Sequence, residues 1–126
     1  MRLLALDYGV ARTGVAISDE TGSIARPLTV VARAGSPGGL EAIRALVATE
    51  GAALVVVGLP VSLDGGEHGQ AREVRSFVAR LRRTVDVPVV LYDERFTTAI
   101  AQQRGGRGPL DARAAAQILE DYLNST

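Results

Sequence analysis

The 126-residue sequence contains no cysteine and no lysine, and His68 is its single histidine. The lack of cysteine excludes disulfides, thiol nucleophiles, iron–sulfur clusters and any zinc site built on two or more His or Cys ligands. The lack of lysine excludes Schiff-base catalysis and the P-loop lysine. A metal-free mechanism that uses two histidines is excluded as well.

Long apolar runs and an excess of charge are also missing. No stretch approaches the roughly 20 apolar residues that span a bilayer, and Asp7 interrupts the first apolar run before it reaches the length of a signal peptide. Fourteen arginines balance fourteen acidic residues, so any polyanionic partner has to be held by a local basic patch. With 47% hydrophobic residues, we expect one globular domain over residues 1–126, soluble and cytoplasmic.

Three short β-rich segments open the chain and predict an antiparallel meander at residues 3–6, 14–18 and 28–32. Ser36 followed by Pro37 predicts a helix start, and apolar residues at helical spacing extend that helix to about Glu50.

The second half of the chain alternates strands with helices. Residues 53–57 are continuously apolar and β-branched, as in a central parallel strand that is buried on both faces. An amphipathic helix is expected around 74–81, a strand at 87–92, a short helix after Thr97 or Thr98 and a last helix at 111–123. The expected class is α/β, with a mixed five-stranded sheet.

Acidic residues fall where the elements of such a sheet end or begin. Asp7 and Glu94 follow the first and fifth strands, and the carboxyl ends of parallel strands are where ligands gather. Asp111 opens the last helix and shares a face with Ala115 and Ile118. Three converging carboxylates suit hard divalent cations such as Mg²⁺ or Mn²⁺.

Each acid also has a structural interpretation. Asp7 suits a turn, Asp111 suits a helix N-cap, and Glu94 suits an ion pair with Arg95 or Arg12. Asp93 points to the opposite side of its strand by the two-residue alternation, so we leave it out of the metal set.

Four motifs in order resemble the YqgF-type, Holliday-junction-resolvase-like family, which is described as a pre-16S rRNA nuclease. They lie between Leu3 and Leu123, and they are Leu6-Asp7-Tyr8-Gly9 with Arg12-Thr13-Gly14, Val57-Gly58-Leu59-Pro60, Asp93-Glu94-Arg95-Phe96-Thr97-Thr98, and Asp111 with Ala114-Ala115 and Ile118-Leu119.

The resemblance implies an RNase H-like fold, with three antiparallel strands, then two parallel strands, and helices on both faces. It also implies metal-dependent phosphodiester hydrolysis at Asp7, Glu94 and Asp111, acting on the 5′ end of precursor 16S rRNA. Two features depart from the pattern. Leu59-Pro60 stand where related resolvases carry an acid, and the segment 99–110 is short, with only Arg104 and Arg107 as basic residues.

Under this interpretation the three acids hold two Mg²⁺ or Mn²⁺ ions about 3.5 to 4 Å apart, and no side-chain general base is needed. Arg12 and Arg95 are placed to bind phosphates, or else pair with neighbouring acids. Tyr8 either stacks on a base or covers the end of the sheet. Only five aromatic residues are present, which favours a structured RNA or branched DNA over single strands.

Two alternatives to a precursor-rRNA nuclease stay open, and a third is excluded by size. A Holliday-junction DNA resolvase and a non-catalytic binding module on the same fold both stay open, as do the monomeric and homodimeric states. An actin-like or sugar-kinase phosphotransferase shares the opening motif but needs two related domains, for which 126 residues are too few.

Overall fold

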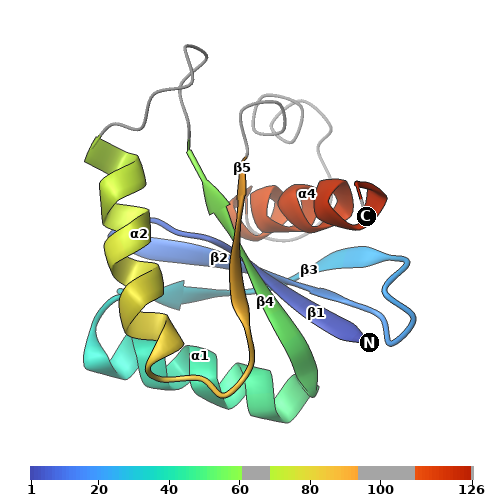
Figure 1. The fold of residues 1–126 in the computed structure, drawn as a ribbon, viewed down its shortest axis with the longest axis horizontal. Helices are drawn as coiled ribbons and strands as arrows, with labels where there is room; N and C mark the ends of the chain where they lie inside the picture. Colours follow the sequence, from blue (N-terminus) through green and yellow to red (C-terminus); the bar gives the residue numbers. More distant parts are fainter. Residues whose placement is uncertain (61–68, 94–109, 126) are drawn as a thin grey trace.

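The protein is described by a computed structural model that covers residues 1–60, 69–93 and 110–125, with the side chains of residues 110 and 111 left out. Five strands form one mixed sheet in the order β3-β2-β1-β4-β5 (Figure 1). The antiparallel part consists of β1 (Arg2–Asp7), β2 (Arg12–Ser18) and β3 (Ala25–Ala32). Strands β4 (Ala52–Leu59) and β5 (Val89–Asp93) continue the sheet in parallel with β1. The predicted mixed sheet is confirmed.

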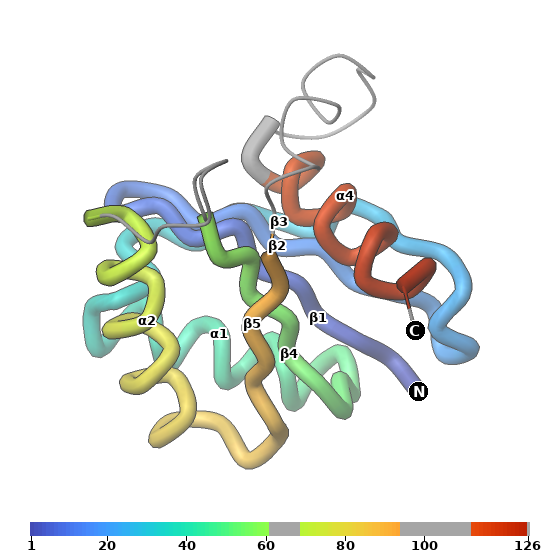
Figure 2. The backbone as a smooth tube through the Cα atoms, turned by 45° about the horizontal axis from the view of Figure 1, so that its top comes forward, coloured from blue at the N-terminus to red at the C-terminus, as the bar shows by residue number. Residues whose placement is uncertain are grey.

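Of the helices in the described residues, two cover one face of the sheet and one covers the other (Figure 2). Helices α1 (Pro37–Glu50) and α2 (Gly69–Arg82) pack on the side of Leu4 and Leu6, and α4 (Leu110–Asn124) packs on the side of Leu3 and Ala5. Side chains alternate along β1 because successive residues of a strand point to opposite faces. The two faces therefore have separate cores.

Strand β4 lies between β1 and β5, as its continuous apolar run predicts. Val55 and Val57 join the core under α1 and α2, while Leu54 and Val56 join the core under α4. All four are buried, which explains why this strand lacks the polar alternation of a half-exposed one.

Helix α1 begins and ends where the sequence predicts. The Ser36 hydroxyl oxygen accepts a hydrogen bond from the Gly39 amide at 3.0 Å, and Pro37 occupies the first turn. Gly51 ends the helix in the left-handed region, at φ 66°. The helix expected after Thr97 or Thr98 lies outside the described residues.

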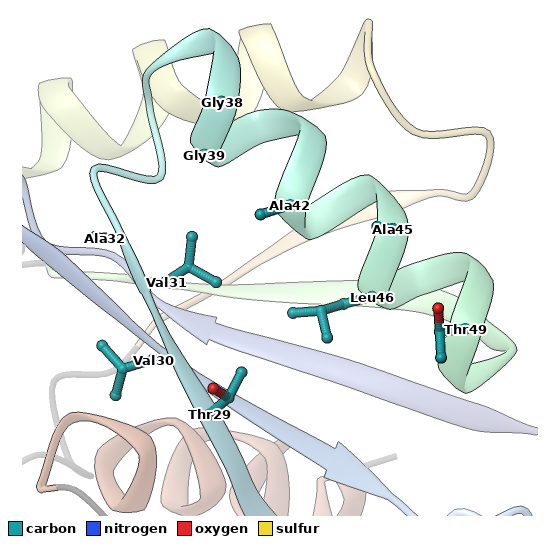
Figure 3. Close-up of a pocket in the computed structure, with 10 residues that line it drawn as sticks. All are labelled: Thr29, Val30, Val31, Ala32, Gly38, Gly39, Ala42, Ala45, Leu46 and Thr49. Atoms are coloured by element: carbon teal, nitrogen blue, oxygen red, sulfur yellow. The ribbon is translucent and has the colours of Figure 1, made fainter.

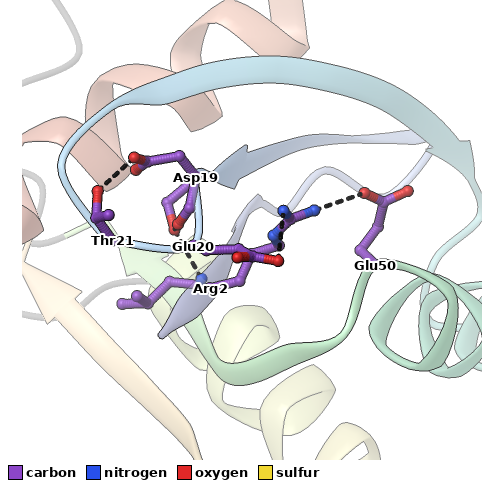
Figure 4. A network of polar contacts seen from close by, with 7 residues as sticks. Arg2, Asp19, Glu20, Thr21 and Glu50 are labelled. Carbon is purple, nitrogen blue, oxygen red and sulfur yellow. Dashed lines mark hydrogen bonds and ion pairs between the residues drawn. The ribbon is translucent and has the colours of Figure 1, made fainter.

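Ion pairs and hydrogen bonds connect the segments at the end of the sheet that lies away from Asp7 (Figure 4). Arg2, at the start of β1, pairs with Glu20 at 3.7 Å and with Glu50 at 3.8 Å. The Asp19 carboxylate accepts hydrogen bonds from the Thr21 hydroxyl and from the following backbone amides in the β2–β3 turn. Among the described helices, none is both long and apolar enough to cross a membrane.

Candidate functional site

Asp7 is the last residue of β1, at the carboxyl end of a central strand. The two-residue alternation puts it on the same face as Leu3 and Ala5, which pack against α4. Its side chain is half-buried. Asp7 thus stands where the sheet edge meets the helix that carries Asp111.

Glycines occupy the strand positions on both sides of Asp7. Gly14 on β2 is its direct partner in the antiparallel ladder. On the other side Leu6 pairs with Val57, and the next position along β4 is Gly58. Neither glycine carries a side chain, so neither β2 nor β4 adds side-chain bulk next to Asp7 at this level.

The turn after Asp7 is held by one close approach and one buried threonine. A Cβ at Gly9 would lie 2.4 Å from the Arg12 carbonyl oxygen, so the turn requires glycine there. Thr13 is fully buried, and its Oγ1 accepts from the Gly9 amide and donates to the Gly9 carbonyl, both at 3.3 Å. The predicted strand at 14–18 leaves Arg12 in this turn, whereas the structure makes Arg12 the exposed first residue of β2.

Strand β5 ends beside β4 and brings a second aspartate to the same edge. Leu59 pairs with Asp93, the last residue of β5. Val90 and Tyr92 pack in the core under α4, whereas Val89 packs in the other core, so Asp93 falls on the face opposite to Asp7. The exclusion of Asp93 from the metal set agrees with this alternation.

Helix α4 presents its apolar side to the sheet at the expected spacing. Ala115 and Ile118 are buried against the sheet, and Tyr122 meets Tyr92 edge to face with 5.8 Å between ring centroids. The helix begins at Leu110, so Asp111 is its second residue. Asp111 therefore lies within the first turn and is not the N-cap that its structural interpretation predicts. The first turn of α4 therefore carries Asp111 above the face on which Asp7 lies.

Several predicted site residues lie outside the part of the chain that the structure describes: Glu94, Arg95, Arg104 and Arg107, together with the side chain of Asp111. Among the described side chains, no three acids gather closely enough to hold a metal ion. Asp7 is the one proposed metal ligand whose side chain is described.

Tyr8 and Arg12 are the other predicted site residues that the structure describes, and Tyr8 packs against α2. Its ring stacks on Phe77 of α2, with 4.4 Å between centroids and 24° between planes. Tyr8 packs against the core on the face opposite to Asp7, so it covers the end of the sheet, as the second interpretation expects.

Arg33 and Arg80 line a hollow together with Tyr8, although the sequence predicts neither arginine as a site residue. The signal for Arg80 is its spacing, because it lies three residues after the buried Phe77 and one before the buried Leu81.

A separate hollow of about 500 Å³ lies between the edge strand β3 and α1 (Figure 3). Val31 and Leu46 contribute to its wall, and none of its lining residues is titratable. Its chemistry differs from that of the edge around Asp7, so we do not include it in the site.

A sheet of three antiparallel strands followed by two parallel ones, with helices on both faces, is that of the RNase H-like fold. The family model "RuvX: Holliday junction resolvase" matches residues 1–125, and this chain belongs to that family.

Relatives and solved structures agree with this assignment. The chain is 41% identical over 133 residues to a "Putative pre-16S rRNA nuclease" of Anaeromyxobacter sp. (strain Fw109-5), covering 98% of this chain and 97% of that protein. It is 39% identical over 134 residues to the protein of the same name from Syntrophus aciditrophicus (strain SB), covering 99% and 89%. The fold matches RuvC from Thermus thermophilus with a TM-score of 0.60 at 18% identity, covering 99% and 95%. It also matches the fowlpox virus Holliday junction resolvase with a TM-score of 0.59 at 13% identity, covering all of both chains.

Proposed function

We propose that this protein is a divalent-metal-dependent endonuclease that hydrolyses phosphodiester bonds in structured RNA, and that its substrate is the 5′ end of precursor 16S rRNA. The observation that carries the proposal is the position of Asp7, at the end of a central strand, between two glycine positions and on the face covered by α4. The substrate follows from the relatives named as pre-16S rRNA nucleases.

The donor set fits a hard divalent cation. Carboxylate oxygens are the ligands that Mg²⁺ and Mn²⁺ prefer, and the strand positions flanking Asp7 are glycines, which add no bulky side chain there. We assign Asp7, Glu94 and Asp111 as the residues that hold the metal. When bound, two such ions supply an activated water and stabilise the charge on the leaving oxygen.

The remaining proposed residues act on the substrate rather than on the ions. Arg12 is exposed beside the Asp7 turn and would contact a phosphate through its planar guanidinium, as would Arg95. Arg104 and Arg107 would extend this contact along the RNA backbone. These contacts position the substrate and carry no sequence information.

The test is cleavage of a precursor 16S rRNA fragment that carries its 5′ extension, with the new 5′ end mapped at nucleotide resolution. We expect cleavage with Mn²⁺ or Mg²⁺, no cleavage with chelator, and a loss of orders of magnitude in Asp7→Asn. The matched control is Asp86→Asn, an exposed aspartate between α2 and β5 at the opposite edge of the sheet. Full activity of Asp7→Asn would exclude the proposed site.

A second substrate class is branched DNA, which two structures with this fold favour. One is T. thermophilus RuvC in complex with a Holliday junction substrate, and the other is fowlpox virus resolvase with Holliday junction DNA. Junction DNA therefore belongs in the same assay. Cleavage of the junction without cleavage of the RNA would assign the protein as a DNA resolvase, and binding of RNA without any metal-dependent cleavage would assign it as a binding module.

A further inference from the structure

A hollow of about 390 Å³ lies beside the candidate site, on the opposite face of β1 from Asp7. Three segments that are distant in sequence form its walls. The β1–β2 turn contributes Tyr8, the connection from β3 to α1 contributes Arg33 and Gly35, and α2 contributes Arg80. Because Tyr8 directly follows Asp7, the hollow and the candidate site adjoin the same edge of the sheet.

The lining of this hollow is positively charged. Among the residues that the structure describes, Arg33 and Arg80 are the charged ones that line it, and none of the described lining residues is acidic. Across the described part of the chain, neither arginine forms an ion pair. Ser36, the N-cap of α1, also lines the hollow, so the positive end of that helix dipole adds to the field.

Two hydrogen bonds hold the Arg80 side chain in place and leave other N–H donors of its guanidinium available. Its Nη1 donates to the Gly35 carbonyl oxygen at 2.5 Å, and its Nε donates to the Ser76 carbonyl oxygen at 3.4 Å. A guanidinium has five N–H donors, so three remain for another acceptor. The half-buried side chain is thus fixed before any ligand binds.

The backbone of Arg33 is fixed as well. Its amide donates to the Ala11 carbonyl at 3.0 Å, and its carbonyl accepts from the Ser36 amide at 2.9 Å. Its φ of 47° lies in the left-handed region, which a non-glycine residue adopts only where its surroundings hold it. These bonds tie Arg33 to the turn that follows Asp7.

Arg80 and Tyr8 both pack closely against Gly35. A Cβ at this position would lie 3.2 Å from both Nη atoms of Arg80 and 3.3 Å from the phenol oxygen of Tyr8. Two guanidinium nitrogens and a phenol oxygen therefore lie close to the same backbone position and to one another. Donors gathered at a hollow whose described lining contains no carboxylate suit a small oxyanion.

We propose that this hollow binds one backbone phosphate of the nucleic acid that is cleaved at Asp7, with Arg33 and Arg80 as the charged ligands and the Tyr8 phenol as a third donor. This inference rests on the proposed function, because it places a second contact on the same polynucleotide. A strand that crosses the carboxyl edge of β1 meets Asp7 on one face and the hollow on the other. The phosphate fixes the position of the strand across the edge.

The experiment measures equilibrium binding of a fluorescently labelled stem-loop RNA in chelator, over a series of salt concentrations. We expect Arg33→Gln and Arg80→Gln each to weaken binding by about tenfold. The double variant lowers the slope of log K against log salt by about one unit, since both arginines contact one phosphate. The matched control is Arg26→Gln, an exposed arginine at the other end of β3, which keeps the wild-type affinity.

Two further variants separate binding from folding. Gly35→Ala places a methyl group against the Arg80 guanidinium and the Tyr8 hydroxyl and shifts both while the arginines stay in the sequence, and Tyr8→Phe keeps the ring and removes the hydroxyl. We expect both to weaken RNA binding with an unchanged Tm. Loss of binding in Arg80→Gln together with a lower Tm, while Arg33→Gln and Gly35→Ala bind normally, would reduce Arg80 to a structural role and overturn the proposal.

The remaining outcomes are also decisive. If wild type binds and cleaves RNA while Arg33→Gln, Arg80→Gln and Arg26→Gln bind alike, the phosphate site is wrong and the proposed function stands. If wild type neither binds nor cleaves RNA or junction DNA, the proposed function fails and the site fails with it. Inorganic phosphate that shifts the Gly35 amide resonance, with RNA binding unchanged in the variants, would assign the hollow to a free anion and overturn its assignment to a polynucleotide.

Discussion

The ring of Tyr8 stacks on the ring of Phe77, with 4.4 Å between centroids and 24° between planes. Tyr8 directly follows Asp7, and Phe77 lies fully buried in α2, so this pair fixes the end of β1 against a helix 69 positions further along the chain. One face of Tyr8 is covered by Phe77. The phenol oxygen reaches the hollow lined by Arg80.

Removing Phe77 is expected to destabilise the fold strongly. Phe77→Ala leaves a cavity beneath α2 and takes away the stacking partner of Tyr8, which should lower the free energy of unfolding by about 3–5 kcal/mol. Urea denaturation followed by circular dichroism measures this change. Tyr8→Phe keeps the stacked ring and should change the free energy of unfolding by less than about 1 kcal/mol, and equal losses in both variants would mean that the phenol rather than the ring holds this end of β1.

Two neighbouring glycines in the first turn of α1 should respond oppositely to alanine. A Cβ at Gly39 would lie 2.1 Å from the Arg33 carbonyl oxygen, a backbone atom, so Gly39→Ala should cost about 1–3 kcal/mol. A Cβ at Gly38 meets nothing within 4 Å, so Gly38→Ala should be neutral or stabilise by up to about 1 kcal/mol. Thermal unfolding of the two variants compares them directly, and a Gly39→Ala protein as stable as Gly38→Ala would contradict the close approach.

The sequence predicts most of the fold because hydrophobic periodicity and capping residues agree with each other. The Ser36-Pro37 signal fits α1, and the apolar run at 53–57 fits a central strand. The bounds of the strands agree less closely, because β3 begins at Ala25 rather than at the predicted residue 28 and so includes Pro27. Pro27 is tolerated because β3 is an edge strand.

The candidate site was predictable only where it depends on strand ends. The position of Asp7 follows from the end of β1, and its face follows from alternation. The hollow beside Asp7 was not predictable, because three segments that are distant in sequence form it: the β1–β2 turn, the β3–α1 connection and helix α2. Arg33 stands in a β3–α1 connection with no periodic pattern, and the role of Arg80 depends on a hydrogen bond to Gly35, 45 positions away.

Asp19 should make stability depend on pH. Hydrogen bonds from the Thr21 hydroxyl, then from the Ile24 and Ser23 amides, hold the pKa of this carboxyl well below its usual range. A depressed folded-state pKa stabilises the fold above the unfolded pKa of about 3.9, and the effect is lost as pH falls through the folded value. Asp19→Asn should therefore lower the Tm at pH 7, and the difference from wild type should shrink as pH falls below about 4.

The control for this measurement is Glu20→Gln in the same turn. Glu20 is 87% exposed at its side chain and pairs with Arg2 at 3.7 Å, so its loss should change the Tm little at any pH. A difference between Asp19→Asn and wild type that stays constant from pH 7 to pH 3 would mean that the charge of Asp19 does not stabilise the β2–β3 turn.

Divalent cations should stabilise the folded protein through Asp7. An ion that binds the native state and not the unfolded chain raises the free energy of unfolding by about 2.7 kcal/mol at a hundredfold excess over its Kd. We expect Mn²⁺ to raise the Tm of wild type and of Asp86→Asn equally, and to raise that of Asp7→Asn much less. Identical melting curves in Mn²⁺ and in chelator for wild type would exclude a metal site in the native protein.

Asp111→Asn tests whether Asp111 binds metal or only stabilises the start of α4. As the second residue of α4, an aspartate interacts favourably with the helix dipole, and replacing it with asparagine should cost about 0.3–1 kcal/mol of stability. If Asp111 holds metal, Asp111→Asn folds with nearly the wild-type Tm but loses orders of magnitude in cleavage, as Asp7→Asn does. The matched control is Asp121→Asn, three turns further along α4, where the carboxylate accepts a hydrogen bond from Gln117 at 3.1 Å. That variant should keep its cleavage rate, because its lost charge lies at the other end of the helix. Cleavage of precursor rRNA by Asp111→Asn at the wild-type rate would leave the residue a helix-stabilising role alone and remove it from the three-carboxylate site.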